Sequence, residues 1–137
     1  MNADDLIVRE MQVAAEGAMK NAYCRYSKFR VGAAVLSDDG QIFAGCNVEN
    51  ASYGLTMCAE RNAIFQAVAQ GARKVKAVVI VTPTETLTPP CGGCRQVINE
   101  FGPEAEIFVF GSGNTARHFK LSELLPDAFG PENLGQE

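Results

Sequence analysis

The run VKAVVIVT, residues 75–82, constrains the fold more strongly than any other part of the sequence. It is an almost continuous series of β-branched and other apolar residues, whereas a strand with one face in water alternates apolar and polar side chains. A strand of this kind is buried on both faces, so helices must cover both sides of its sheet. The sequence therefore predicts a three-layer α/β/α domain.

The other expected elements alternate between helix and strand around this run. Apolar residues at helical spacing predict a first helix over residues 3–20, with Asn2 as its N-cap, and a second over residues 58–70, ending at Gly71. The stretch PPCGGCRQVINEFG predicts a loop that opens into a third helix, with Pro90 near its first turn and Gly102 near its end, and LSELLPDAF predicts a short terminal helix. Further strands are expected at residues 31–37, 41–48, 106–112 and 116–121, the first two joined as a hairpin through an Asp-Gly turn.

Length and charge limit the range of functions. The 137 residues are of ordinary size for one domain and contain no repeat or long linker, so we expect a single domain over residues 1–137. A net charge of -4 argues against general nucleic-acid binding, which relies on a basic surface. No apolar run is long enough for a membrane span, and the N-terminus lacks signal-peptide features. We expect a cytoplasmic protein with a small neutral or cationic ligand, and with no nucleic-acid or membrane partner.

Five cysteines carry the strongest chemical signal. Their odd number excludes a fully paired set of disulfides within one chain, and in a reducing compartment clustered cysteines indicate metal ligands or catalytic groups. Cys91 and Cys94 stand three positions apart at an expected helix start, which is typical of a redox pair, half of a structural zinc site or one edge of a catalytic zinc site. Cys58 also stands at a helix start, where the helix dipole stabilises a thiolate. If the two helix ends face each other, the three thiolates form one site.

The number of ligands separates the zinc alternatives, because a structural site takes four protein ligands and a catalytic site takes three and keeps a position for water. Cys24 and Cys46 stand alone in apolar or aromatic surroundings and are expected to be small buried residues. His118, the only histidine, is expected to be a partly exposed strand residue rather than a ligand. Three ligands then remain, which favours a catalytic site.

Glu60, two residues after Cys58, is the candidate catalytic group. A carboxylate beside a zinc-bound water can collect its proton and deliver it elsewhere. The alternative is that Glu60 only supports the helix dipole, as first-turn glutamates usually do. Arg61 directly follows Glu60, and Arg95 directly follows Cys94. We hypothesise that both arginines hydrogen-bond the ligand sulfurs and offset the negative charge of three thiolates.

Together these motifs resemble the small zinc-dependent cytidine deaminases. CAE and PCGGC match the zinc-deaminase signature, with a cysteine as the first ligand. The similarity runs from AYCRYSKFRVGAAV through GCNVENASYG, CAER and PCGGCRQV to ELLPDAFGPENL, about residues 15–134. The resemblance implies the α/β/α cytidine deaminase fold with a central mixed five-stranded sheet.

The resemblance also implies an activity and a set of site residues. The implied reaction is hydrolytic deamination of cytidine and deoxycytidine to the uridine nucleosides in pyrimidine salvage, with Glu60 as the proton shuttle and one zinc ion per chain. The implied metal ligands are Cys58, Cys91 and Cys94. The implied substrate-binding residues are Asn47 and Glu49 at the ribose, Phe29 against the pyrimidine, and Phe129, which reaches the base bound by a neighbouring subunit of a homotetramer.

Three alternatives stand beside this interpretation. A structural zinc or redox module built on CGGC would leave Glu60 dispensable and would turn over no nucleoside. Deamination of a base within RNA or DNA needs a basic groove and stacking aromatics, for which Arg25, Lys28 and Arg30 offer only a modest cluster. A modified cytidine or a nucleoside antibiotic would use the same metal centre. Asn62 departs from the family's usual CAERTA motif, which puts the fine substrate preference in question.

Overall fold

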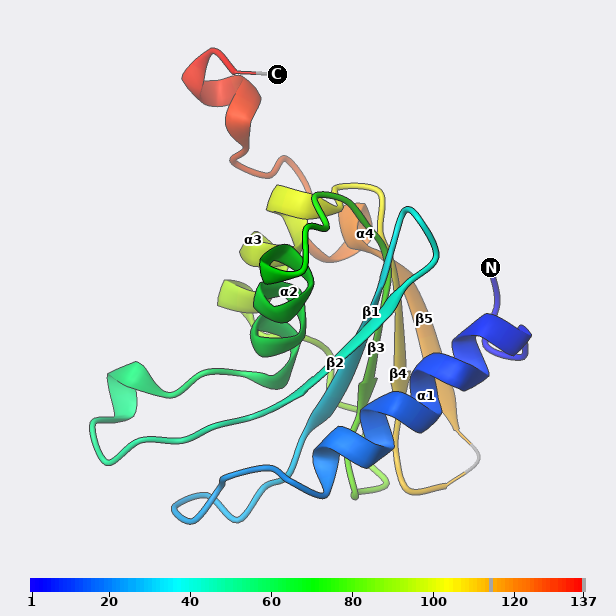
Figure 1. Cartoon of the computed structure of the whole chain (residues 1–137), viewed down its shortest axis with the longest axis vertical. Helices are drawn as coiled ribbons and strands as arrows, with labels where there is room; N and C mark the ends of the chain where they lie inside the picture. The colour runs from blue at the N-terminus through cyan, green and yellow to red at the C-terminus, as the bar shows by residue number, and fades with distance from the viewer. Residues whose placement is uncertain (114, 137) are drawn as a thin grey trace.

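A mixed five-stranded sheet lies between two layers of helices (Figure 1). The computed structural model describes residues 1–113 and 115–136. The sheet order is β2-β1-β3-β4-β5; β3 and β4 are parallel, and the other neighbours are antiparallel. The strands are β1 (Gly32–Ser37), β2 (Ile42–Cys46), β3 (Val75–Val81), β4 (Glu106–Phe110) and β5 (Ala116–Lys120). The predicted fold class is confirmed.

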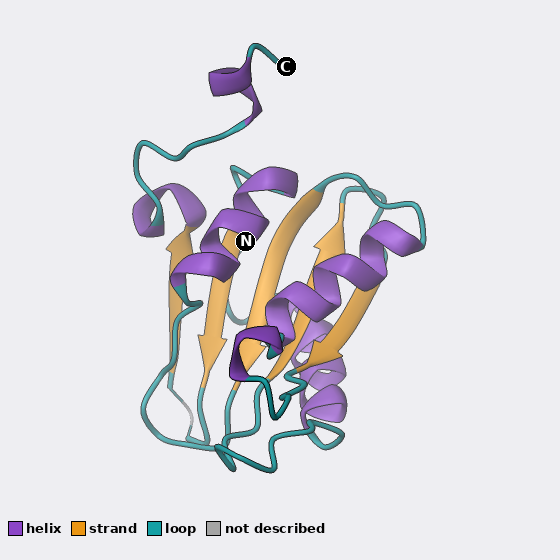
Figure 2. Ribbon diagram, turned by 90° about the vertical axis from the view of Figure 1, so that its left-hand side faces the viewer, coloured by secondary structure: helices purple, strands orange, loops and turns teal. Residues whose placement is uncertain are grey.

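Helices cover both faces of the sheet (Figure 2). One face carries α1 (Leu6–Met19), and the other carries α2 (Ala59–Ala69), α3 (Gly92–Phe101) and α4 (Leu121–Leu124). Two short 3₁₀ helices, η1 (Tyr53–Leu55) and η2 (Pro131–Leu134), lie in segments that extend away from the sheet and its helices. Within the described residues, no helix has both the length and the apolar character that crossing a membrane would require.

The central strand β3 packs its side chains alternately into the two layers. Val78 and Ile80 join the core under α2 and α3, whereas Ala77 and Val79 join the core under α1. All of these side chains are fully buried. Burial of one Val or Ile side chain stabilises a fold by roughly 1.5–3 kcal/mol. The apolar run that predicted three layers is therefore the element that holds the layers together.

Two predicted helix boundaries are wrong. Asn2 is not the N-cap of α1; Asp5 occupies that position, and its carboxylate accepts a hydrogen bond from the Asn2 backbone N–H at 3.0 Å. The terminal helix ends at Leu124 instead of continuing to residue 129. Its cap, Leu125, precedes Pro126, and a proline ring disfavours helical backbone angles in the residue before it. The chain beyond α4 leaves the helical layer as an extended tail.

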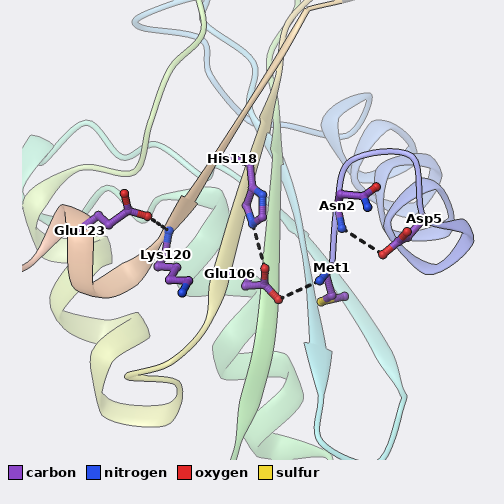
Figure 3. A network of polar contacts seen from close by, with 7 residues as sticks. All are labelled: Met1, Asn2, Asp5, Glu106, His118, Lys120 and Glu123. Atoms are coloured by element: carbon purple, nitrogen blue, oxygen red, sulfur yellow. Dashed lines mark hydrogen bonds and ion pairs between the residues drawn. The ribbon is translucent and has the colours of Figure 1, made fainter.

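Polar contacts fasten the N-terminus and the edge strand β5 to β4 (Figure 3). His118 Nε2 lies 2.9 Å from Glu106 Oε1, and the Met1 amino group lies 3.5 Å from Glu106 Oε2. The His118 ring also stacks on Phe108, with ring centroids 4.2 Å apart. The only histidine thus belongs to the sheet edge.

At Gly45, β2 and α2 approach each other so closely that only glycine fits. A Cβ atom on Gly45 would lie 2.5 Å from Ala63 N and 2.9 Å from Ala59 O. Asn62 reinforces this junction, because its Nδ2 donates a hydrogen bond to Cys46 O at 2.8 Å. The end of β2 and the first turns of α2 are therefore held in one fixed relation.

We predict that Gly45→Ala lowers the free energy of unfolding by about 1–3 kcal/mol, the usual cost of forcing extra volume into a packed interior. Gly17→Ala is the matched control, because a Cβ at this exposed position in α1 would meet no atom within 4 Å. The control should gain about 0.5–1 kcal/mol from higher helix propensity. Urea unfolding at one protein concentration measures both, and equal stability of the two variants would contradict the close approach.

Candidate active site

Two helix N-termini bring three thiols together. Cys58 is the N-cap of α2, and Cys91 is the N-cap of α3, with Cys94 in the first turn of α3. The three Sγ atoms all lie within 4.8 Å of one another, and those of Cys58 and Cys91 are 3.9 Å apart. These cysteines are thus gathered where the positive ends of two helix dipoles favour thiolates.

The donor set fits zinc. Zn–S bonds of about 2.3 Å in a tetrahedral site place neighbouring sulfurs roughly 3.8 Å apart, close to the separation of Cys58 and Cys91. Among the described residues, this trio is the group of three or more potential ligand side chains close enough to share an ion. Cys24 and Cys46 lie outside it as free thiols. Three ligands leave a zinc ion with a position for water.

Glu60 lies at this site in the first turn of α2, and only 5% of its surface is exposed. Burial raises the pKa of its carboxyl group above the ordinary value, and the neighbouring Cys58 thiolate acts in the same direction. A group that is buried beside the thiols and holds its proton more tightly than usual is suited to accept and return a proton.

The two arginines have different partners. Arg61 Nη2 donates a hydrogen bond to Cys58 Sγ at 3.2 Å, so the expected contact with sulfur is present. Arg95 instead donates to two backbone carbonyls, from Nε to Pro90 O at 2.8 Å and from Nη1 to Leu124 O at 2.9 Å. The hydrogen bonds found for Arg95 thus do not include the hypothesised one to sulfur. They fix the loop before Cys91 against the end of α4.

Cys58 loses its proton more easily than Cys94. A hydrogen bond from Cys94 and the bond from Arg61 lower its pKa to about 5, against the opposing effect of partial burial. The pKa of Cys94 is raised, since Cys94 is the donor in that pair and is buried as well. In the metal-free protein, Cys58 is therefore ionised before Cys94.

The predicted sugar-binding residues follow β2 and adjoin the thiol site through the backbone. Val48, which lies between Asn47 and Glu49, pairs with Met57 by two backbone hydrogen bonds of 2.9 Å. Met57 directly precedes Cys58. Asn47 is buried, and Glu49 and Phe29 are partly exposed. The segment of residues 26–31, which contains Phe29, is hydrogen-bonded to both side chains: Glu49 accepts from its backbone N–H groups, and Asn47 both donates to it and accepts from it.

Phe129 lies on the tail that follows α4, with 58% of its surface exposed. Its backbone carbonyl accepts hydrogen bonds from Gln96 Nε2 at 2.8 Å and from Asn99 Nδ2 at 3.3 Å. The tail is thereby attached to α3, the helix that carries Cys94, while the Phe129 residue remains largely exposed.

Sequence reasoning missed Ser27. Its hydroxyl donates to Glu49 Oε2 and accepts a hydrogen bond from the Phe29 backbone N–H at 3.1 Å. The available signal was the serine two positions before Phe29, because Ser side chains commonly accept a bond from the backbone two residues on. Its hydrogen bond to Glu49 could not be predicted from the sequence, because only the fold brings these two distant residues together.

Comparison with known proteins decides the family. Residues 7–110 match the family model described as "Cytidine and deoxycytidylate deaminase zinc-binding region". The chain belongs to the cytidine deaminase family. A curated cytidine deaminase from Halalkalibacterium halodurans is 44% identical over 130 residues, which span 94% of this chain and 96% of the relative. A second, from Sporosarcina psychrophila, is 43% identical over 93% of this chain and 94% of its own length.

Solved structures of cytidine deaminases share the fold. A crystal structure of the Burkholderia pseudomallei cytidine deaminase has a TM-score of 0.84 at 46% identity, covering 88% of this chain and 98% of that one. The Mycobacterium tuberculosis cytidine deaminase has a TM-score of 0.79 at 40% identity, covering 92% and 99%. The matched zinc-binding region of this cytidine deaminase family member includes Cys58, Cys91 and Cys94.

We predict that, after zinc is stripped with a chelator, iodoacetamide modifies Cys58 already at about pH 6, because only thiolates react quickly. Cys94 should stay unmodified until much higher pH, since its pKa is raised. Arg61→Ala should shift the Cys58 profile to higher pH by removing a hydrogen bond that lowers its pKa. Mass spectrometry of the modified peptides measures each profile. Coincident profiles for Cys58 and Cys94 would contradict this arrangement of charge.

Proposed function

We propose that this protein hydrolyses cytidine and 2'-deoxycytidine to uridine and 2'-deoxyuridine with release of ammonia. The observation that carries the proposal is the buried Glu60 beside three clustered thiols, in a chain of the cytidine deaminase family. A redox or structural zinc module has no use for a buried carboxyl group at this position. The relatives named cytidine deaminase support the nucleoside as substrate.

In the proposed mechanism, Cys58, Cys91 and Cys94 would hold one zinc ion per chain. When bound, zinc lets a water molecule lose its proton near neutral pH. Glu60 accepts that proton as the water oxygen attacks carbon 4 of the base, and delivers it to ring nitrogen 3. Glu60 then transfers the second proton of the water to the amino group, which leaves as ammonia. The reaction consumes one water molecule and releases one ammonia molecule for each cytidine converted to uridine.

The remaining residues bind and orient the nucleoside. Asn47 uses one N–H for Phe29 O and has a second N–H for a ribose hydroxyl, while the carboxylate of Glu49 has acceptor capacity beyond its present bonds. Phe29 lies against the pyrimidine in this proposal. Arg61 withdraws negative charge from Cys58 through their hydrogen bond, which would preserve the power of a bound zinc ion to acidify water.

We predict that purified, zinc-loaded protein converts cytidine to uridine, followed by ultraviolet absorbance, and that Glu60→Gln lowers kcat by about 10²–10⁴-fold. The variant should retain zinc, because Glu60 is not among the clustered thiols. Glu16→Gln, an exposed change in α1, is the matched control and should leave kcat unchanged. A Glu60→Gln variant with zinc and full activity would contradict the proton shuttle.

We further propose that the protein is a homotetramer and that Phe129 completes the site of a neighbouring subunit. Support comes from large apolar side chains left open on the extended segments: Tyr53 is 73% exposed, Leu55 68% and Phe129 58%. Apolar side chains gathered on projecting segments are typical of surfaces that another chain covers.

Subunit mixing tests this arrangement. Phe129→Ala alone should raise the KM for cytidine, and Glu60→Gln alone should be nearly inactive. Mixed tetramers, formed by dissociation and reassembly of the two variants, should contain sites with Glu60 from one chain and Phe129 from its neighbour, and should regain part of the native low-KM activity. Absence of this recovery, with mixed tetramers verified by native mass spectrometry, would assign Phe129 to its own subunit or to no site.

The wider biological setting follows from the same chemistry. We propose that residues 1–137 act as one deaminase domain in pyrimidine salvage and that the protein resides in the cytoplasm. The site requires three free thiols, which a reducing compartment preserves, and all five cysteines are free in the structure.

A further inference from the structure

The segment of residues 26–31 is held by a network that starts from the carboxylate of Glu49. Glu49 Oε1 accepts hydrogen bonds from the backbone N–H groups of Tyr26 at 3.0 Å and Ser27 at 3.1 Å. Glu49 Oε2 accepts a hydrogen bond from the Ser27 hydroxyl. These contacts lower the pKa of Glu49, with the Ser27 hydroxyl as the largest cause. The carboxylate is thus ionised and aimed by the same three donors.

Phe29 is held through its backbone on both sides. Its N–H donates to Ser27 Oγ at 3.1 Å, and its carbonyl accepts from Asn47 Nδ2 at 2.8 Å. Asn47 Oδ1 accepts from the Val31 N–H at 2.9 Å, which fixes the end of the segment. The ring of Phe29 therefore projects from a backbone whose two polar groups are both engaged by side chains.

Lys28 shows how firmly this segment is fixed. Its φ of 62° lies in the left-handed region, which is strained for a residue with a Cβ atom. The strained conformation persists because neighbours on both sides are held, by Ser27 and Asn47 contacts, and because the Lys28 N–H bonds to Cys24 O at 2.8 Å. The hydroxyl of Ser27 is the point at which the Glu49 contacts and the Phe29 contact meet.

We propose that Ser27 is a positioning residue, which couples the sugar-binding carboxylate of Glu49 to the base-contacting ring of Phe29 by hydrogen-bonding both. This inference rests on the proposed function. It means that sugar binding by Glu49 and base binding by Phe29 depend on the same hydroxyl, so that loss of the Ser27 hydroxyl weakens both. Chemistry on bound substrate is spared, because Glu60 and the thiols come from α2, α3 and their N-caps.

The test compares three variants of the zinc-loaded protein. Ser27→Ala should raise the KM for cytidine about tenfold, the size expected for loss of a hydrogen bond to a charged group, while kcat stays within about twofold. Ser27→Thr keeps the hydroxyl and should restore a near-native KM. Ser27→Cys keeps the size but is a weak donor, and should fall between the two. Zinc content should be equal in all three, because Ser27 is not among the clustered thiols.

A double-mutant cycle distinguishes coupling from a general loss of structure. If Ser27 acts through Glu49, adding Ser27→Ala to Glu49→Gln should raise KM much less than it does in the native background. Additive effects on KM, an unchanged KM in Ser27→Ala, or a fall in kcat that follows lost zinc would each overturn the inference. Failure of the native protein to convert cytidine would overturn the proposed function itself, before any variant is compared.

Discussion

The meeting of two helix N-termini is the constraint on which the site depends. Thiolates repel one another, and burying several of them requires compensating positive charge. The first turns of α2 and α3 offer unpaired backbone N–H groups and the positive ends of their dipoles at one point, and Arg61 adds a hydrogen bond to Cys58. The sheet makes this meeting possible, because both helices pack on the same face of β1, β3 and β4.

The layered fold and the cluster of three thiols could be predicted because each rests on a local pattern. The apolar run of β3 required cover on both faces, and cysteines at two helix starts needed only one long-range assumption, that the starts converge. In the middle of a helix, Cys58 and Glu60 could not both face one point, since side chains two residues apart point in different directions. They can do so here because Cys58 is the N-cap, and its extended backbone, with ψ of 155°, does not follow the helical rotation.

The contacts that could not be predicted join residues distant in sequence with no pattern between them. Arg95 stands beside Cys94 in sequence, yet its guanidinium reaches the carbonyl of Leu124, a partner that only the packing of α3 on α4 brings close. Ser27 depends in the same way on the position of Glu49 after β2. The end of α4 could have been anticipated from Pro126, whose effect on the preceding residue outweighs the apolar pattern that continues past it.

The close approach at Gly45 has a consequence for redesign of the site. Backbone meets backbone there, so the strand that leads to Asn47 and the helix that carries Glu60 cannot slide apart or be wedged further open without loss of packing. The separation between Asn47 and Glu60 is therefore set by the scaffold. A redesign of the region around Asn47 and Glu60 therefore has to change side chains outside this junction, because the junction itself does not accept added volume.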